Sequence, residues 1–151
     1  MPDTRLKEFL DNEHVKYVTI GHSPAYTAQE IAALAHIPGR ELAKTVIVKV
    51  DGELAMVVVP ASEHVRLARL CETLGAHDVE LADENEFMHA FPDCETGAMP
   101  PFGNLYGMKV FVSQVLREDD EIAFNAGSHD ELIRLPYAEY ERLVHPTPLT
   151  N

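Results

Sequence analysis

The sequence predicts an α/β domain, α+β-like in character, with a mixed β-sheet in place of a regular parallel βαβ series. Stretches with strand character are interleaved with stretches of helical periodicity along the 151 residues. The apolar stretches 43–50 and 53–59 are joined by Asp51-Gly52, a favoured type I′ turn, which predicts an antiparallel hairpin. Because this hairpin stands among strands that helices separate, both parallel and antiparallel pairs are expected in one sheet.

Apolar spacing and helix signals define the elements before the hairpin. A stripe of apolar residues predicts a helix over 4–13, and 17–20 has the composition of a short strand. Thr27 and Glu30 form a capping box that opens a second helix. Pro38-Gly39 ends it.

The hairpin itself is predicted to be central in the sheet. Residues 54–59 are apolar on both faces, so the strand should be covered on both sides. Ser62 is expected to cap a helix over 63–74, which Gly75 ends. Arg66 and Arg69 give this helix a small basic stripe, for which plain solvation is the ordinary explanation.

Shorter elements are predicted in the second half. Asp83 and Glu86 suggest a capping pair for a short helix. Pro136 suits the first turn of a last helix, and the tail 145–151 is expected to be frayed. Three strands are predicted between these helices, at 109–112, 121–125 and 131–135.

Composition limits the class of protein. Residues 1–151 are expected to form one domain, with no membrane partner and a cytoplasmic location, since no apolar stretch resembles a membrane span or a signal peptide. Cys71 and Cys94 lack CxxC spacing, and both are predicted to be thiols. Twelve Lys and Arg against 25 Asp and Glu give a net charge of −13, which conflicts with DNA binding. Binding of only the terminal nucleotides of an RNA needs few phosphate contacts and is compatible with this net charge.

Two features point to a site. The loop Gly97-Ala98-Met99-Pro100-Pro101-Phe102-Gly103 brackets two prolines between glycines, so its backbone N–H groups could approach an oxygen of a ligand closely. Lys44 begins an apolar strand and shares a face with its valines, where it is either a snorkelling edge residue or a cation held in a cleft. The lysine and the loop are predicted to meet across one cavity.

Three segments resemble the YbaK/prolyl-tRNA synthetase-associated domain family. They are Leu42-Ala43-Lys44-Thr45-Val46-Ile47-Val48, the Gly97-x-x-x-Pro101 loop through Phe102-Gly103, and Phe124-Asn125-Ala126-Gly127-Ser128-His129. The resemblance covers about 17 to about 140. It implies a compact domain with a mixed, partly barrel-like sheet and flanking helices, acting as a free-standing aminoacyl-tRNA deacylase.

The resemblance also implies the substrate and the site. The expected partner is the 3′ acceptor end of mischarged tRNA, carrying a small amino acid (Ala, or Cys) on proline tRNA, with a synthetase as a further partner and neither cofactor nor metal. The implied catalytic residues are Lys44, Gly97 and Pro101, and the implied substrate-binding residues are Tyr26, Thr27, Ala98, Met99, Phe102 and His129.

Several of these residues have structural alternatives. Thr27 is explained by its capping role and Tyr26 by a place in the core. Met99 and Phe102 either line the pocket or anchor the loop, and His129 either shapes the pocket or lies in a surface turn.

The sequence lacks the usual machinery of a hydrolase. It contains no HExxH, paired CxxC, P-loop, GxGxxG or GxSxG motif, and adjacent Ser128-His129-Asp130 rarely align as a triad. An aminoacyl ester is already activated by the vicinal ribose hydroxyl, so hydrolysis assisted by the substrate is expected. The alternative is a non-catalytic regulatory module that binds a nucleotide or an aminoacyl group.

Overall fold

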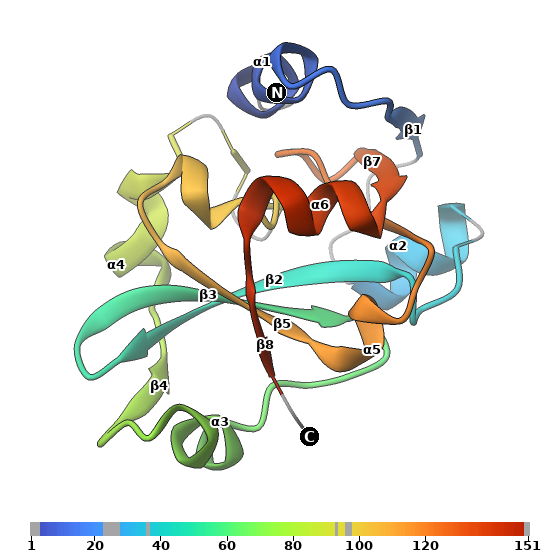
Figure 1. Ribbon diagram of the computed structural model, residues 1–151. Helices are drawn as coiled ribbons and strands as arrows, with labels where there is room; N and C mark the ends of the chain where they lie inside the picture. The colour runs from blue at the N-terminus through green and yellow to red at the C-terminus, as the bar shows by residue number, and fades with distance from the viewer. Residues whose placement is uncertain (1–3, 23–27, 36, 93, 96–97, 150–151) are drawn as a thin grey trace.

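The computed structural model describes residues 4–22, 28–35, 37–92, 94–95 and 98–149, which form a mixed sheet with helices on both faces (Figure 1). The helices are α1 (Thr4–Asn12), α2 (Ala28–Ala35), α3 (Leu67–Leu74), α4 (Glu84–Phe87), α5 (Gln114–Arg117) and α6 (Tyr137–Val144), with 3₁₀ turns at Met88–Ala90 and Gly103–Leu105. The strands are β1 (Val18–Gly21), β2 (Leu42–Val50), β3 (Glu53–Pro60), β4 (Val79–Leu81), β5 (Lys109–Ser113), β6 (Glu121–Asn125), β7 (Glu131–Pro136) and β8 (Thr147–Leu149).

The β2–β3 hairpin is the centre of the sheet. The strand order is β1-β7-β6-β2-β3-β5-β8, and β4 pairs with β2 beside this path. One edge of β2 pairs with β3, while the other pairs with β6 at its start and with β4 at its end. The β2–β6, β3–β5 and β5–β8 pairs are parallel and the remaining pairs are antiparallel, which confirms the predicted mixed sheet.

The turn of the hairpin has the predicted geometry. Asp51 and Gly52 both have positive φ, 50° and 88°, as a type I′ turn requires. The Asp51 carboxylate also accepts hydrogen bonds from the N–H groups of His77 (2.9 Å) and Asp78 (2.8 Å). The turn therefore also fixes the loop that precedes β4.

Helices cover both faces of the hairpin, as the apolar pattern of β3 predicts. On one face, Met56 and Val58 share a core with side chains of α1, α4 and α6. On the other face, Val57 and Val59 pack against Leu70 of α3. Figure 1 shows α6 and α3 on opposite sides of the hairpin, and these two sides are called the α6 face and the α3 face below.

The structure corrects two predicted elements. The helix expected from residue 63 begins only at Leu67. The N–H of Glu63 instead donates to the carbonyl of Pro60 (2.9 Å) in a turn, and the backbone of Arg66 is still extended (φ −100°, ψ 102°). The tail expected to be frayed forms β8, in which Leu149 is buried on the α3 face.

Other local signals hold. Gly75 ends α3 in the left-handed conformation (φ 65°), and Asp83 with Glu86 forms the predicted capping box of α4. Pro136 lies at the N-cap of α6, one residue before the helical turn where it was expected. Cys71 and Cys94 are both thiols and form no disulfide with each other, as predicted.

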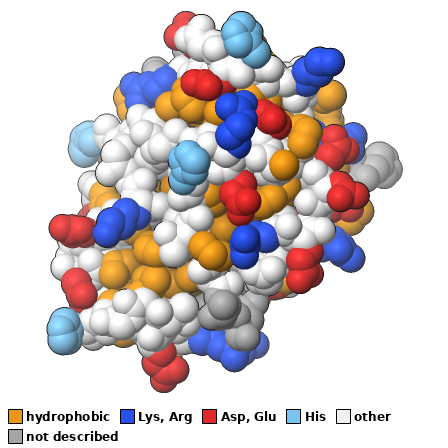
Figure 2. All heavy atoms as spheres, in the orientation of Figure 1, with side chains coloured by type: hydrophobic (Ala, Val, Ile, Leu, Met, Phe, Trp, Pro, Cys, Tyr) orange, Lys and Arg blue, Asp and Glu red, His pale blue; other side chains and the backbone are white. Residues whose placement is uncertain are grey.

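The surface carries charges of both signs. Figure 2 shows acidic and basic side chains interspersed over one face of the molecule. None of the helices in the described part of the chain combines the length and the apolar character needed to cross a bilayer.

Candidate functional site

The lysine strand, the Gly/Pro loop and the segment 124–129 come together where β6 ends. β2 starts beside β6 in parallel register, with Ala43 opposite Phe124. Beyond β6, the N–H of Gly127 donates to the carbonyl of Ala98 (3.0 Å), and the N–H of Glu95 donates to the carbonyl of Gly127 (2.8 Å). These two bonds hold Glu95 and the described part of the Gly/Pro loop, which starts at Ala98, near the carboxyl end of β6.

Lys44 projects from the α3 face of β2. It shares this face with Val46 and Val48, as its place in the strand predicts, and its cross-strand partner is Val59. The side chain is half-buried, and burial lowers the pKa of its ammonium group, while the nearby carboxylate of Glu63 acts in the opposite direction. Lys44 forms no ion pair with any described carboxylate, so its charge remains available to a ligand.

The apolar side chains of the loop pack on the opposite face. Ala98, Met99 and Phe102 are buried, and the last two join the core of the α6 face. Phe102 is fully enclosed against Phe124 and Tyr140. Phe102 therefore anchors the loop. Because these side chains point away from the face of Lys44, only the backbone of this part of the loop could contribute to the predicted cavity beside Lys44.

A buried hydrogen bond fixes the shape of the loop. The hydroxyl of Tyr140 donates to the carbonyl of Pro101 at 2.7 Å. Burial raises the pKa of Tyr140 well above its ordinary value, so the hydroxyl keeps its proton and continues to donate at any working pH. Pro101 is thus held from the α6 face, and a catalytic role for it stays a prediction.

The loop offers fewer backbone donors than its sequence suggests. The N–H of Ala98 donates to the carbonyl of Glu95 (3.0 Å), and Pro100 and Pro101 have no N–H. An oxyanion hole in this loop therefore cannot draw on these three residues. Gly97, the other expected contributor, lies outside the described residues.

His129 is buried, with 8% of its surface exposed, so the surface-turn interpretation is wrong. Its N–H donates to a carboxylate oxygen of Glu95 (3.3 Å), and Gly127 (φ 98°) permits the tight turn before it. The Ser128 hydroxyl donates to Asp130 (2.8 Å), not to the imidazole, which agrees with the absence of a triad. A role for His129 in shaping an amino-acid pocket stays a prediction.

Asn125 is a candidate that sequence reasoning missed. Continuing the β2–β6 register by one residue places it beside Lys44, on the same face. Its buried Oδ1 has no hydrogen-bond partner among the described residues, and such an atom is costly unless a ligand or water satisfies it. The feature of the sequence that could have indicated Asn125 is its position as a polar residue at the end of an apolar strand.

The segment that holds Tyr26 and Thr27 lies outside the described residues, so their substrate-binding roles stay predictions. The chain enters this segment next to the site, since the N–H of His22 donates to the carbonyl of Asp130 (2.9 Å). It leaves the segment at α2, which packs against Leu42 on the same sheet face as Lys44.

Replacing Glu63 by glutamine is expected to lower the pKa of Lys44 further. The carboxylate raises this pKa against the effect of burial, so its removal leaves burial unopposed, and the ammonium loses its proton at a lower pH. Titration of the lysine side-chain carbon by NMR measures the change. Glu53→Gln, at an exposed position in the hairpin, is the control. A Lys44 pKa that is the same in wild type and Glu63→Gln would contradict the predicted electrostatic contact.

Comparisons with known proteins agree on one family. A family model described as an aminoacyl-tRNA editing domain matches residues 22–143. The chain is 27% identical over 147 residues to the Multifunctional Ser/Thr-tRNA deacylase ProXp-y of Escherichia coli (strain K12), covering 94% of this chain and 87% of that protein.

Two further similarities extend this result. The chain is 28% identical over 101 residues to the Proline–tRNA ligase of Staphylococcus saprophyticus, which covers 67% of this chain and 18% of the ligase. The crystal structure of a "putative trans-editing enzyme for prolyl tRNA synthetase" superposes with a TM-score of 0.80 at 19% identity, covering 97% of this chain and 95% of that one. At this identity the structural match shows the fold.

Proposed function

Because the chain belongs to the aminoacyl-tRNA editing domain family, we propose that it hydrolyses the ester that joins an amino acid to the 3′ end of a mischarged tRNA. One observation carries the proposal. The matched residues 22–143 contain Lys44, the Gly/Pro loop and the segment 124–129, and the β2–β6 pairing and the Gly127 hydrogen bonds hold all three at one end of the sheet.

The proposed reaction is attack of water on the ester, assisted by the substrate. The vicinal ribose hydroxyl activates the ester and helps to deliver the water, so the protein has to hold the acyl group, position the water and stabilise the developing oxyanion. This chemistry requires neither a protein nucleophile nor a metal. The water adds to the carbonyl carbon, the bond to the ribose oxygen breaks, and that oxygen leaves with a proton.

The charged and polar groups on the α3 face suit the nucleotide end of this substrate. Lys44 is proposed to bind a phosphate or hydroxyl of the terminal adenosine, because it is half-buried and forms no ion pair with the described carboxylates. Asn125 beside it offers a buried oxygen that lacks a partner among the described residues, which suits a ribose hydroxyl or an amino group.

The proposed substrates are small amino acids on proline tRNA, with alanine and cysteine first. A synthetase pocket rejects a smaller amino acid poorly, since a missing methylene is worth only about 1–3 kcal/mol, and a second pocket corrects the error. The similarity to proline–tRNA ligases supports proline tRNA and a synthetase partner. The relative named for Ser/Thr-tRNA makes serine and threonine the next amino acids to test.

The test is a panel of aminoacyl-tRNAs. Purified protein is incubated with Ala-, Cys-, Ser- and Thr-tRNA, each prepared on proline tRNA and on its cognate tRNA, and with correctly charged Pro-tRNA. Loss of the labelled amino acid is measured against buffer alone. Hydrolysis of at least one small aminoacyl ester, with Pro-tRNA spared, is the expected result. Rates equal to buffer across the whole panel would refute a deacylase.

A second candidate function is a regulatory module that binds an aminoacyl group or a nucleotide without hydrolysis. The net charge of −13 favours it, because that charge weakens binding to a whole tRNA more than to a small ligand. Binding of an aminoacyl-nucleotide together with zero turnover on the panel would support this alternative.

A further inference from the structure

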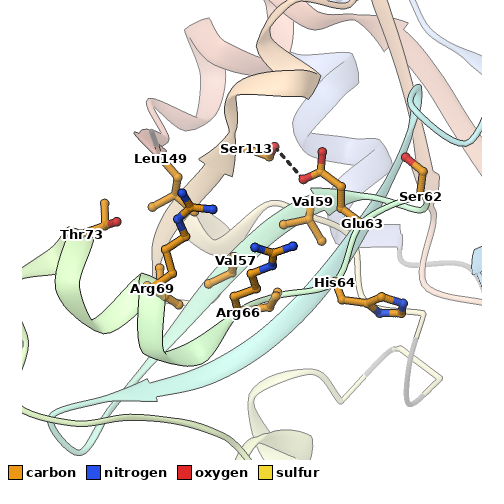
Figure 3. Close-up of a pocket in the computed structure, with 12 residues that line it drawn as sticks. Val57, Val59, Ser62, Glu63, His64, Arg66, Arg69, Thr73, Ser113 and Leu149 are labelled. Carbon is orange, nitrogen blue, oxygen red and sulfur yellow. Dashed lines mark hydrogen bonds between the residues drawn. The ribbon is translucent and has the colours of Figure 1, made fainter. Parts of the chain in front are cut away.

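A cavity of about 470 Å³ lies on the α3 face between β3 and α3 (Figure 3). This volume is within the range of about 300–1,000 Å³ that is usual for small-ligand sites. Its floor is apolar, formed by Val57, Val59, Leu70 and Leu149. Its rim is polar, with Ser62, Glu63, His64, Arg66, Arg69, Thr73 and Ser113.

Two arginines on the rim lack an ion-pair partner within the described part of the chain. Arg66 and Arg69 form no ion pair with any described carboxylate, whereas Lys7, Arg40 and Lys49 each do. In a chain of net charge −13, two arginines three positions apart, neither paired with a described carboxylate, concentrate positive charge at this cavity. Figure 3 shows both side chains extending from the start of α3 toward the part of the cavity that Glu63 and Ser113 line.

The start of α3 adds to this positive character. Arg66 is the N-cap residue, and because a guanidinium group has no hydrogen-bond acceptor, its side chain cannot cap the N–H groups of the first turn. Such a helix end favours an anion through its N–H groups and its dipole. Glu63, the acidic side chain among the described residues of the rim, accepts a hydrogen bond from Ser113 (3.4 Å). Burial lowers the pKa of Lys44, and the Glu63 carboxylate opposes this lowering.

The cavity adjoins the proposed binding lysine. Val59 forms part of its floor and is the cross-strand partner of Lys44, so the two side chains are neighbours on one face. A chain of nucleotides whose last residue contacts Lys44 would therefore pass next to Arg66 and Arg69. Ribose and base suit the apolar floor, and phosphates suit the two arginines.

We propose that this cavity binds the single-stranded 3′ end of the tRNA, with Arg66 and Arg69 contacting the phosphates that precede the terminal adenosine. The inference rests on the proposed deacylase function and adds the place where the nucleic acid backbone is held. It also accounts for RNA binding by a strongly acidic protein, since two local contacts suffice for a short single strand.

The test combines two substrates with the double variant Arg66→Gln/Arg69→Gln. On aminoacyl-tRNA, KM is expected to rise about 10–100-fold, which corresponds to about 1.4–2.8 kcal/mol of binding for the two phosphate contacts together. The value of kcat should stay within about twofold of wild type. On 2′(3′)-O-aminoacyl-adenosine, which has no preceding phosphates, wild type and variant should be equal. Lys16→Gln, at an exposed position outside the cavity, is the matched control on both substrates.

Salt dependence and direct binding give independent readouts. Two lost contacts to single-stranded RNA should reduce the slope of log affinity against log salt by about 1.4, at about 0.7 for each phosphate. This slope is measured by anisotropy with an uncharged RNA that ends in CCA, so it is independent of turnover. Thermal melting checks that the double variant stays folded, as expected for exposed arginines.

The outcomes separate the two proposals. An unchanged slope and an unchanged KM in the folded double variant would overturn the binding cavity while leaving the deacylase intact. Equal losses on both substrates would also overturn it, since the arginines would then act on the acyl end. A wild-type protein that shows no turnover and yet binds RNA in a way that the double variant does not is the remaining outcome. That result would support RNA binding in the cavity and refute the deacylase function.

Discussion

Replacing Lys44 by alanine is expected to lower kcat/KM for deacylation about 100-fold. The ammonium group is half-buried and makes no ion pair with the described carboxylates, so its charge is free to stabilise a phosphate or hydroxyl of the substrate. A charge-assisted hydrogen bond of this kind contributes about 3 kcal/mol, which corresponds to this change in rate. Single-turnover hydrolysis of the preferred mischarged tRNA measures the effect.

Two controls isolate the charge of Lys44. Lys16→Ala removes an exposed lysine from the loop before β1 and should leave kcat/KM within about twofold of wild type. Lys44→Met keeps the length of the side chain on the α3 face but not its charge, and it should be as slow as Lys44→Ala. If Lys44→Met retained full activity, or if Lys16→Ala were equally slow, the assigned role of Lys44 would have to be abandoned.

Replacing Phe102 by alanine is expected to cost about 3–5 kcal/mol of folding free energy. The ring is completely buried, and its centroid lies 5.4 Å from those of Phe124 and Tyr140 and 6.2 Å from that of Phe9. Truncation leaves a cavity among three aromatic rings, which are too rigid to fill it. This cost is a large part of the about 5–15 kcal/mol that stabilises a typical domain.

Equilibrium unfolding in urea measures this loss. Phe102→Leu keeps most of the volume and should cost clearly less, so it remains measurable if the alanine variant does not fold. Met88→Ala, at a site that is 46% exposed, should stay within about 0.5 kcal/mol of wild type. A cost below about 1 kcal/mol for Phe102→Ala would show that the ring does not anchor the loop.

The parts of the fold predicted correctly are those that local signals determine. The Asp51-Gly52 turn and the capping box at Asp83 each need only a few neighbouring residues, and both occur as expected. The start of α3 was wrong because residues 63–66 are held in part by the contact between Glu63 and Ser113, a partner on a distant strand. The tail was wrong for the same reason, since β8 exists only through its pairing with β5.

The site shows the same division. Alternation along β2 correctly gave the face of Lys44, but it could not show that Met99 and Phe102 pack on the other face. The approach of the loop to the segment 124–129 depends on backbone bonds between remote residues, which no single-sequence pattern encodes. Asn125 was missed because its importance lies in a buried atom without a described partner, a property of packing.

The place of β8 has a practical consequence for purification tags. Leu149, where β8 ends, lines the cavity on the α3 face, so a tag attached to the chain beyond this strand starts from the wall of the cavity. A polyhistidine tag at this end would lie near Arg66 and Arg69 and would interfere with titrations of RNA binding. The first described helix, α1, lies on the far side of the sheet (Figure 1), which makes the amino-terminal end the better place for a handle.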